Sequence, residues 1–330
     1  METVKQVVVK VLQKTGRFSD PRPYAYSPGY VFTHDPDCCE YDWLVVYDEF
    51  ERPETLRCPR ERTILATWEP VSIKGYSRAY TRQFAHLLTN RPPEAERHPG
   101  YHLGRGYFYW FNDRDFRENA TVAIPEKTKL ISAACSSKRM RRTRHFARYA
   151  LVEALANAIP GFDWFGHGVR GFERKYEVLD PYRYHVAVEN HIGAHHWTEK
   201  LADALLCECL PFYAGDPAIA EALPADCLIP IPIDDPAAAV RIVKEAIAGN
   251  EYEKRRGAIL EAKRLILAKY NFWAQVIEVI EGAAARPATP PDPSRPIVVL
   301  PRRILRRRNL GAVVEEALGH VARFFGRIPS

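Results

Sequence analysis

The sequence of 330 residues contains no long hydrophobic run and no secretory signal. A helix that crosses a bilayer needs about 20 apolar residues in a row, and no segment approaches that length. The first residues, METVKQVVVKVLQK, form an apolar run that is too short and too interrupted by lysine for a signal peptide. These absences predict a cytoplasmic protein without a transmembrane anchor.

Paired cysteine motifs are also missing. The chain has seven cysteines, an odd number, and none of them has C-x-x-C spacing. This pattern argues against a disulfide framework and against a zinc knuckle. It predicts reduced thiols, most of them buried: Cys38, Cys39, Cys58, Cys135, Cys207, Cys209 and Cys227.

Excess positive charge is absent from most of the chain. The net charge is +6, and residues 295–330 contain eight arginines against two glutamates, so residues 1–294 are close to neutral. A nucleic-acid partner would need a basic face or an aromatic platform elsewhere in the chain. We therefore expect no nucleic acid partner.

The C-terminal residues have the pattern of an interfacial helix. The proline-rich stretch RPATPPDPSRP at 286–296 predicts a linker, and the cluster RRILRRR then precedes an apolar stripe at helical spacing. Basic residues followed by an amphipathic helix are typical of segments that bind anionic lipid. We expect residues 302–328 to contact the inner face of the membrane; the alternative is a helix packed on the protein.

Short runs of β-branched residues predict an α/β fold. Strand patterns occur at 5–12 (KQVVVKVL), 41–49 (YDWLVVYDE) and 62–70 (RTILATWEP). From Lys129 onward, strand and helix patterns alternate in the βαβ rhythm of a parallel sheet. We predict an N-terminal α/β domain at 1–128, a Rossmann-like domain at 129–285, and the linker and basic tail at 286–330.

Residues 184–217 (YHVAVENHIGAHHWTEKLADALLCECLPFYAGDP) gather charged groups where a predicted strand ends and a helix begins. In a parallel sheet, ligands bind beyond the carboxyl ends of the strands. The helix start at Thr198 and the charge of Lys200 suit a phosphate, and the Glu199 carboxylate suits sugar hydroxyls. The alternative, a solvated loop with a capped helix, does not explain why so many polar groups converge.

Several motifs in this region and before it occur together. They are TWEP at 67–70, RYALVEALA at 148–156, V-E-N at 188–190, T-E-K at 198–200 and LPFYAG at 210–215. This set resembles the α-1,3/4-fucosyltransferases, glycosyltransferase family ten. The resemblance includes the spacing between V-E-N at the strand end and T-E-K at the helix start. The resemblance spans roughly residues 60–282 and is strongest after Lys129.

The resemblance implies an α/β protein of GT-B type, with two Rossmann-like domains facing across a cleft. It also implies an inverting transfer of fucose from GDP-fucose to a glycan hydroxyl, on a cell-surface polysaccharide, a lipopolysaccharide or its precursor. Arg148 and Lys200 would neutralise the donor diphosphate, and no cofactor or metal would be required. The full donor-binding set would be Arg148, Glu189, Asn190, His196, Glu199 and Lys200.

The same resemblance implies a catalytic base in the N-terminal domain. Glu69 would take the proton of the acceptor hydroxyl, because it follows an apolar strand and precedes Pro70 at a strand end. Glu61 and Asp113 are lesser candidates. The D-x-D pairs at 35–37 and 113–115 would suit a metal-dependent transferase, but short acidic pairs are common in loops.

Two departures from the family pattern leave other functions open. His191 replaces a small residue, and His196-Trp197 replaces the usual Tyr-[Ile/Val], so the same fold with another nucleotide-sugar donor is an alternative. With His195 these imidazoles also suggest a zinc site, but no nearby aspartate or cysteine completes one. A third alternative is a non-catalytic sugar- or lipid-binding protein.

Overall fold

The structure is a computed structural model that describes residues 6–14, 24–27, 29–70, 73–106, 112–137, 144–284 and 287–308, with Gly311, Val314 and Glu316. The chain forms two compact units. Unit 1 consists of Met1–Gly104 and Gln275–Ser330, and unit 2 of Arg105–Ala274. None of the helices in the described part of the chain is long and apolar enough to cross a membrane.

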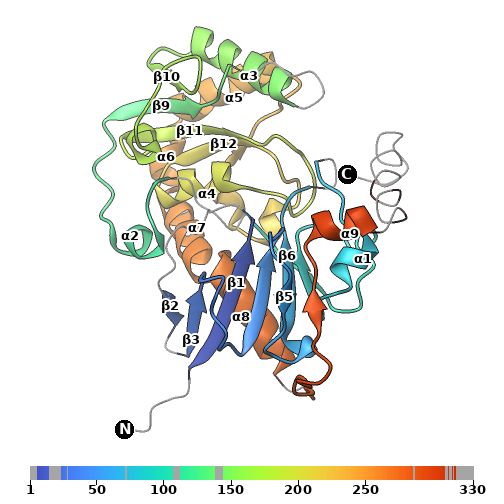
Figure 1. Cartoon of the computed structure of the whole chain (residues 1–330). Helices are drawn as coiled ribbons and strands as arrows, with labels where there is room; N and C mark the ends of the chain where they lie inside the picture. The colour runs from blue at the N-terminus through green and yellow to red at the C-terminus, as the bar shows by residue number, and fades with distance from the viewer. Residues whose placement is uncertain are drawn as a thin grey trace, which may run out of the picture. The chain divides into compact units, whose positions relative to one another are not determined.

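Unit 1 is built on a seven-stranded sheet (Figure 1). All neighbouring strands are parallel except the first pair, and the order is β2 (Tyr24–Ser27), β3 (Tyr30–Thr33), β1 (Val7–Gln13), β4 (Trp43–Tyr47), β6 (Thr63–Thr67), β7 (His86–Thr89) and β8 (Tyr101–Leu103). The strands β4 and β6 are buried along their whole length. Continuous apolar runs of this kind are typical of parallel strands that are covered on both faces. The three predicted N-terminal strands are confirmed as β1, β4 and β6.

The C-terminal residues complete unit 1. Strand β14 (Val298–Val299) pairs antiparallel with β5 (Glu54–Thr55), and Val299 is only 1% exposed within a core cluster of this unit. The Gln83 side chain bonds to both the N–H and the C=O of Leu300. The remaining elements of the unit are η1 (Arg60–Arg62), α1 (Arg78–Thr81), α8 (Phe272–Ala283) and α9 (Arg302–Arg308), with α8 lying against the sheet (Figure 1).

This division of the chain differs from the predicted boundaries at 128/129 and 285/286. Residues 298–308 do not leave the globular part as a tail, because β14 and α9 pack on unit 1. Residues 287–296, most of the predicted linker, contain no helix or strand and are mostly exposed. Residues 105–128 go with unit 2, since α2 (Phe116–Thr121) and its flanks bond to it: Arg114 pairs with Asp180, and Lys127 donates to the Cys207 carbonyl.

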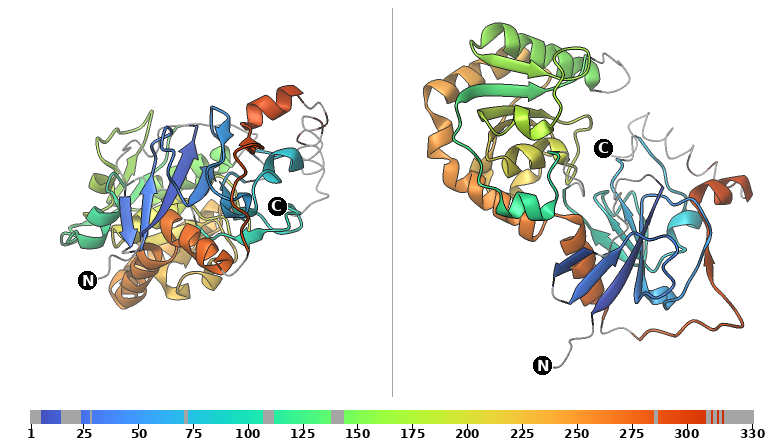
Figure 2. Two further views of the ribbon diagram at one scale, coloured as in Figure 1. Left: turned by 60° about the horizontal axis from the view of Figure 1, so that its bottom comes forward. Right: turned by 60° about the vertical axis from the view of Figure 1, so that its left-hand side comes forward.

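Unit 2 contains a parallel five-stranded sheet in the order β10 (Phe162–Phe165), β9 (Lys129–Ala134), β11 (Tyr182–Val188), β12 (Leu210–Ala214) and β13 (Ile229–Pro230). The helices α3 (His145–Ala158) and α5 (Pro236–Ala248) pack together on one face, and α4 (Glu199–Leu206) and α7 (Arg256–Ala268) on the other (Figures 1 and 2). Short helices complete the unit: η2 (Lys175–Val178), η3 (Ile219–Glu221), η4 (Ala225–Cys227) and α6 (Glu251–Lys254). The predicted parallel sheet is confirmed.

The pairing of β14 with β5 generates a stability prediction. Replacing Val299 by Ala removes buried methyl groups and should lower the free energy of unfolding by about 2 kcal/mol in urea titrations. The matched control is Val298→Ala on the same strand, where the side chain is 43% exposed and the effect should stay within about 0.5 kcal/mol. Equal effects at the two positions would contradict the packing of residues 298–299 in unit 1.

Candidate active site

The sheet of unit 2 has a topological switch point between β9 and β11. From β9 the chain crosses to β10 on one side, and then returns past β9 to β11 on the other. The two connecting segments diverge beyond the carboxyl ends of these strands, which is where open α/β sheets bind ligands. The residues that follow the two strand ends are Cys135 and Glu189.

A buried carboxylate organises this point of the fold. Glu189 is 0% exposed, and its two oxygens accept hydrogen bonds from the Thr198 N–H (2.8 Å) and the Thr198 hydroxyl (2.6 Å). Thr198 is also the N-cap of α4, because its hydroxyl accepts from the Lys200 N–H. The end of β11 is thereby fixed to the start of α4. A Cβ on Gly215 would lie 2.7 Å from Glu189 Cγ, so only glycine fits beside the carboxylate.

Two cations meet at the same place. Lys200 Nζ lies 2.7 Å from Glu199 Oε1 and 3.7 Å from Glu189 Oε2. Arg148, from the second turn of α3, donates to the Asn190 side-chain oxygen, and its buried Nε has no hydrogen-bond partner among the described residues. The two charges are close enough to repel each other: Arg148 acts against the protonated form of Lys200, although other groups outweigh this effect. The predicted residues Arg148, Asn190, Glu199 and Lys200 are thus brought together.

Burial and neighbouring charges shift the pKa values of Glu189, Glu199 and Lys200. Burial raises the pKa of Glu189, although Lys200 acts against this shift. Burial also opposes ionisation of Glu199, but the positive charges of Lys200 and Lys175 outweigh it and the pKa lies below the usual range. For Lys200, burial favours the neutral form, but Glu189 and Glu199 outweigh it and the pKa is raised. Lys200 therefore stays protonated at neutral pH and can attract an anion.

The loop between Asn190 and Thr198 packs inward. The Trp197 ring is 1% exposed and lies edge-on to Tyr270, with centroids 6.0 Å apart. The His191 and His196 rings lie edge to face, with centroids 5.1 Å apart. Burial lowers the pKa of His191, and the positive charge of Arg144 lowers it further.

Asp216 shapes the same loop. It accepts from the His195 N–H (2.9 Å) and the Ala218 N–H (2.8 Å), which is the bonding of a turn residue. Trp197 therefore belongs to the core, and the His196 ring that contacts His191 is buried as well.

Some residues of this site carried no sequence signal. Lys175 forms a 2.6 Å ion pair with the fully buried Asp203 and lowers the pKa of Glu199. Burial raises the pKa of the Cys135 thiol, while Arg148 and Lys200 act against that shift, so the thiol lies near both cations. Lys175 is in a short 3-10 helix and Cys135 follows β9. Both are brought to the site by the crossover connections, which a strand pattern does not reveal.

In unit 1, Glu69 follows β6 at the carboxyl edge of the sheet. It lines a cavity of about 210 Å³ together with Asp48, Glu49 and Lys74. Asp48 has a left-handed backbone (φ 62°), and its carboxylate bonds to Lys74 Nζ (2.6 Å). Arg91 donates to the backbone carbonyls of both Glu69 and Lys74. An acidic residue beyond a strand end therefore lines a small cavity among other charged residues, and those neighbouring residues were not predicted.

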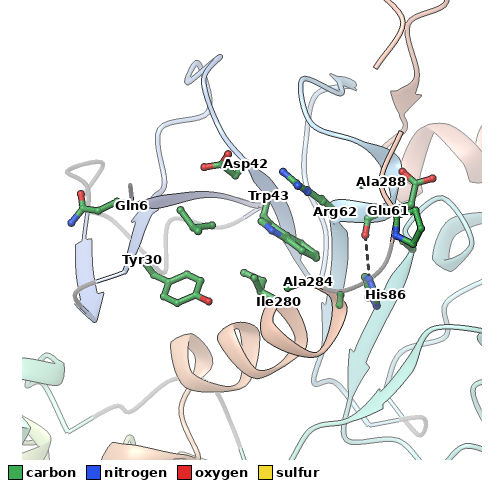
Figure 3. A pocket seen from close by; sticks show the side chains of 14 residues that line it. Gln6, Tyr30, Asp42, Trp43, Glu61, Arg62, His86, Ile280, Ala284 and Ala288 are labelled. Atoms are coloured by element: carbon green, nitrogen blue, oxygen red, sulfur yellow. Dashed lines mark hydrogen bonds between the residues drawn. The ribbon is translucent and has the colours of Figure 1, made fainter. Parts of the chain in front are cut away.

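The other two base candidates lie elsewhere. Glu61 lines a cavity of about 440 Å³ at the amino edge of the unit 1 sheet, where its carbonyl accepts from His86 Nε2 at 3.2 Å (Figure 3). Figure 3 shows Trp43 of this cavity between the strands and α8. Asp113 belongs to unit 2, and its carboxylate accepts from the Lys175 N–H at 2.6 Å. Among the three, Glu69 alone lies at the carboxyl edge of a sheet.

The acidic pairs and the histidines were the suggested metal ligands. Asp35 accepts from the Asp37 N–H, and Asp37 pairs with Arg52. Asp115 caps α2 in a capping box with Glu118. Over the part of the chain that the structure describes, no group of three or more His, Cys, Asp or Glu residues is placed to hold a metal ion.

Comparison with known proteins gives matches among solved structures. No family model matches the sequence, and no curated protein matches it. A crystal structure of an alpha1,3-fucosyltransferase is 13% identical and has a TM-score of 0.53, over 88% of this chain and 92% of that one. An alpha1,3-fucosyltransferase with GDP-fucose is 14% identical with a TM-score of 0.52, over 88% and 94%. One with GDP is 14% identical with a TM-score of 0.52, over 86% and 91%.

Identities this low bear on the fold and not on the reaction. The predicted fold class, α/β of GT-B type with two Rossmann-like units, is confirmed. The resemblance to the fucosyltransferases is confirmed at the level of the fold. The roles of the individual site residues stay predictions.

Proposed function

We propose that the protein is an inverting glycosyltransferase whose unit 2 binds a nucleotide-sugar donor. The observation that supports this most is the convergence of Arg148, Lys200, Asn190 and Glu199 at the switch point of the sheet. A helix start and two cations suit a diphosphate, and the amide and carboxylate suit sugar or ribose hydroxyls. Glu189 holds this arrangement together through Thr198.

The proposed donor is GDP-fucose. It is supported by the V-E-N and T-E-K motifs and by the common fold with an alpha1,3-fucosyltransferase whose structure contains GDP-fucose. Another nucleotide sugar is the second candidate, because His191 and His196 are close in sequence to Asn190 and Glu199, at positions where the fucosyltransferase pattern has other residues. The acceptor is a glycan hydroxyl on a polysaccharide, a lipopolysaccharide or its precursor.

The proposed reaction is a direct displacement. The acceptor oxygen bonds to the anomeric carbon as the bond from that carbon to the diphosphate oxygen breaks, and Glu69 takes the acceptor proton. Negative charge grows on the leaving diphosphate, where the fixed charges of Arg148 and Lys200 stabilise it. Since these two side chains supply the positive charge, we propose that the transfer needs no divalent metal.

The cation roles predict the effect of removing each charge. Lys200→Ala and Arg148→Ala should each lower kcat/KM for sugar transfer from GDP-fucose by at least about 100-fold, because the leaving diphosphate loses a fixed counter-charge. Transfer to a glycan acceptor, followed by GDP release, measures this. The controls are Lys244→Ala and Arg241→Ala on the exposed side of α5. Rates within twofold of wild type in the site variants would refute the diphosphate role.

The base role predicts a different kinetic pattern. Glu69→Gln keeps the shape of the side chain but removes the proton acceptor, so kcat should fall by about 100- to 10,000-fold while the Kd for GDP-fucose is unchanged. The control is Glu61→Gln at the opposite edge of the same sheet, which should leave kcat near wild type. If Glu61→Gln is the damaging change, or if Glu69→Gln retains full kcat, Glu69 is not the base.

We also propose that the C-terminal residues attach the protein to anionic lipid. The support is a row of exposed arginines on α9, Arg303, Arg306, Arg307 and Arg308. Most of the predicted lipid-binding segment 302–328, beyond Arg308, lies outside the described residues.

Reversing two of these charges tests the attachment. Arg307→Glu with Arg308→Glu should lower partitioning onto phosphatidylserine vesicles at least tenfold in co-sedimentation, since each basic residue near such a surface is worth about 1 kcal/mol. Arg241→Glu with Lys244→Glu on α5 is the control with the same change of charge. Equal partitioning of the two double variants would count against attachment through α9.

A further inference from the structure

An ion-pair network joins the C-terminal helix to the cavity that contains Glu69. Arg302, the first residue of α9, lies with its Nη1 2.8 Å from Glu49 Oε1. Lys74 Nζ lies 2.9 Å from the same Glu49 oxygen and 2.6 Å from Asp48 Oδ2. Glu49, Asp48 and Lys74 all line the cavity with Glu69. A residue 253 positions away in the chain therefore pairs with the wall of this cavity.

The Arg302 side chain is itself held in one orientation. Its Nε and Nη2 bond to the two oxygens of Glu316 at 3.1 and 2.5 Å, which is the bidentate geometry of a strong arginine pair. Glu316 is 5% exposed and also accepts from the Ser77 N–H. The Arg302 guanidinium lies 5.9 Å from the centre of the Tyr76 ring. The third nitrogen is thereby directed at Glu49.

The network continues from Lys74 to Glu69. One Arg91 nitrogen donates to the Lys74 carbonyl (2.6 Å) and to the Glu69 carbonyl (2.8 Å), so the two backbone segments are tied together. The Arg91 guanidinium also lies 4.5 Å from the Tyr76 ring centre, and the Tyr76 hydroxyl donates to Asp48. Arg302, Lys74 and Arg91 therefore surround one tyrosine and connect Glu49 to the backbone at Glu69.

We propose that Arg302 is a positioning residue for the carboxyl-edge cavity of unit 1: by pairing with Glu49 it fixes Lys74 and the backbone at Glu69. This inference rests on the proposed role of Glu69 as the base. Asp48 and Glu49 bring two negative charges to Lys74, which is largely buried. Lys14 lies 3.6 Å from Glu49 but is 54% exposed, so Arg302 supplies the second largely buried positive charge. Without it, Glu49 draws Lys74 away from Asp48 and the cavity becomes more negative.

The charged groups around Glu49 determine the sign of the effect. Lys14, Lys74 and Arg302 pair with its carboxylate, and Asp48 and Tyr80 lie near it. Burial opposes ionisation of Glu49, but Lys74 and Arg302 outweigh it and keep its pKa below the usual range. Loss of Arg302 therefore raises the proton affinity of Glu49 and of the neighbouring carboxylates.

Kinetics of three variants test the proposal. The matched control is Arg295→Ala, which removes an exposed arginine before the proposed lipid-binding segment. Arg302→Ala should lower kcat/KM about tenfold with an unchanged KM for the donor, and should move the acidic limb of the pH profile to higher pH. Arg302→Lys should restore the acidic limb, because the charge returns, but only part of the rate. Glu49→Gln should move the acidic limb to lower pH, since a negative charge is lost.

The results that would overturn the role of Arg302 differ from those that would overturn the proposed function. Equal kcat/KM and equal acidic limbs of the pH profile in Arg302→Ala and Arg295→Ala would overturn the inference, even if the melting temperature falls. If Arg302→Ala does not fold, Glu49→Gln still tests the inference. An acidic limb of its pH profile at the same pH as in the wild type would overturn the inference. If the wild type transfers no sugar, the proposed function fails, and ¹³C NMR titration of the Glu49 carboxyl then tests the pairing with Arg302. The pKa of Glu49 should rise in Arg302→Ala but not in Arg295→Ala.

Discussion

The contact on which the site of unit 2 depends is the bond between a buried carboxylate and a helix cap. Glu189 has no exposed surface, and burying a carboxylate is costly unless donors surround it. Thr198 supplies two such donors, and Lys200 lies 3.7 Å away. One residue thus joins a strand end to a helix start and directs the lysine of that helix toward the switch point. The positions of Asn190 and Glu199 follow from this joint.

Unit 1 shows a similar use of charge at its carboxyl edge, but with partners from distant parts of the chain. Acidic residues follow the strands β4 and β6, and the compensating cations come from Lys74, Arg91 and Arg302. A left-handed residue, Asp48, is kept in place by bonds from Lys74 and Tyr76. The C-terminal segment therefore contributes to the core through Val299 and to the charge balance of the cavity through Arg302.

The sequence was informative where contacts are local or where a motif has fixed spacing. The apolar runs predicted β1, β4, β6 and the sheet of unit 2, because buried parallel strands are apolar along their whole length. The predicted strand end at V-E-N and helix start at T-E-K indicated that Glu189 to Lys200 would lie together at the carboxyl edge of the sheet.

Contacts between distant residues were not predictable. Arg302 reaches Glu49 across 253 positions, and Lys175 reaches Glu199 at the switch point through a crossover connection. The boundary at 286 was drawn from proline content, which reports local chain stiffness but not the later pairing of Val298–Val299 with β5.

The central claim, that the charges at the switch point bind a nucleotide diphosphate without metal, is tested most directly by thermal stabilisation in EDTA. GDP, UDP, CDP, dTDP and GDP-fucose would be compared at the same concentrations. The account predicts that GDP and GDP-fucose raise the melting temperature most, because binding at 100 times Kd adds about 2.7 kcal/mol to the native state. A preference for another nucleotide would keep the site and change the donor. No response to any of the five, with or without added magnesium, would contradict the account.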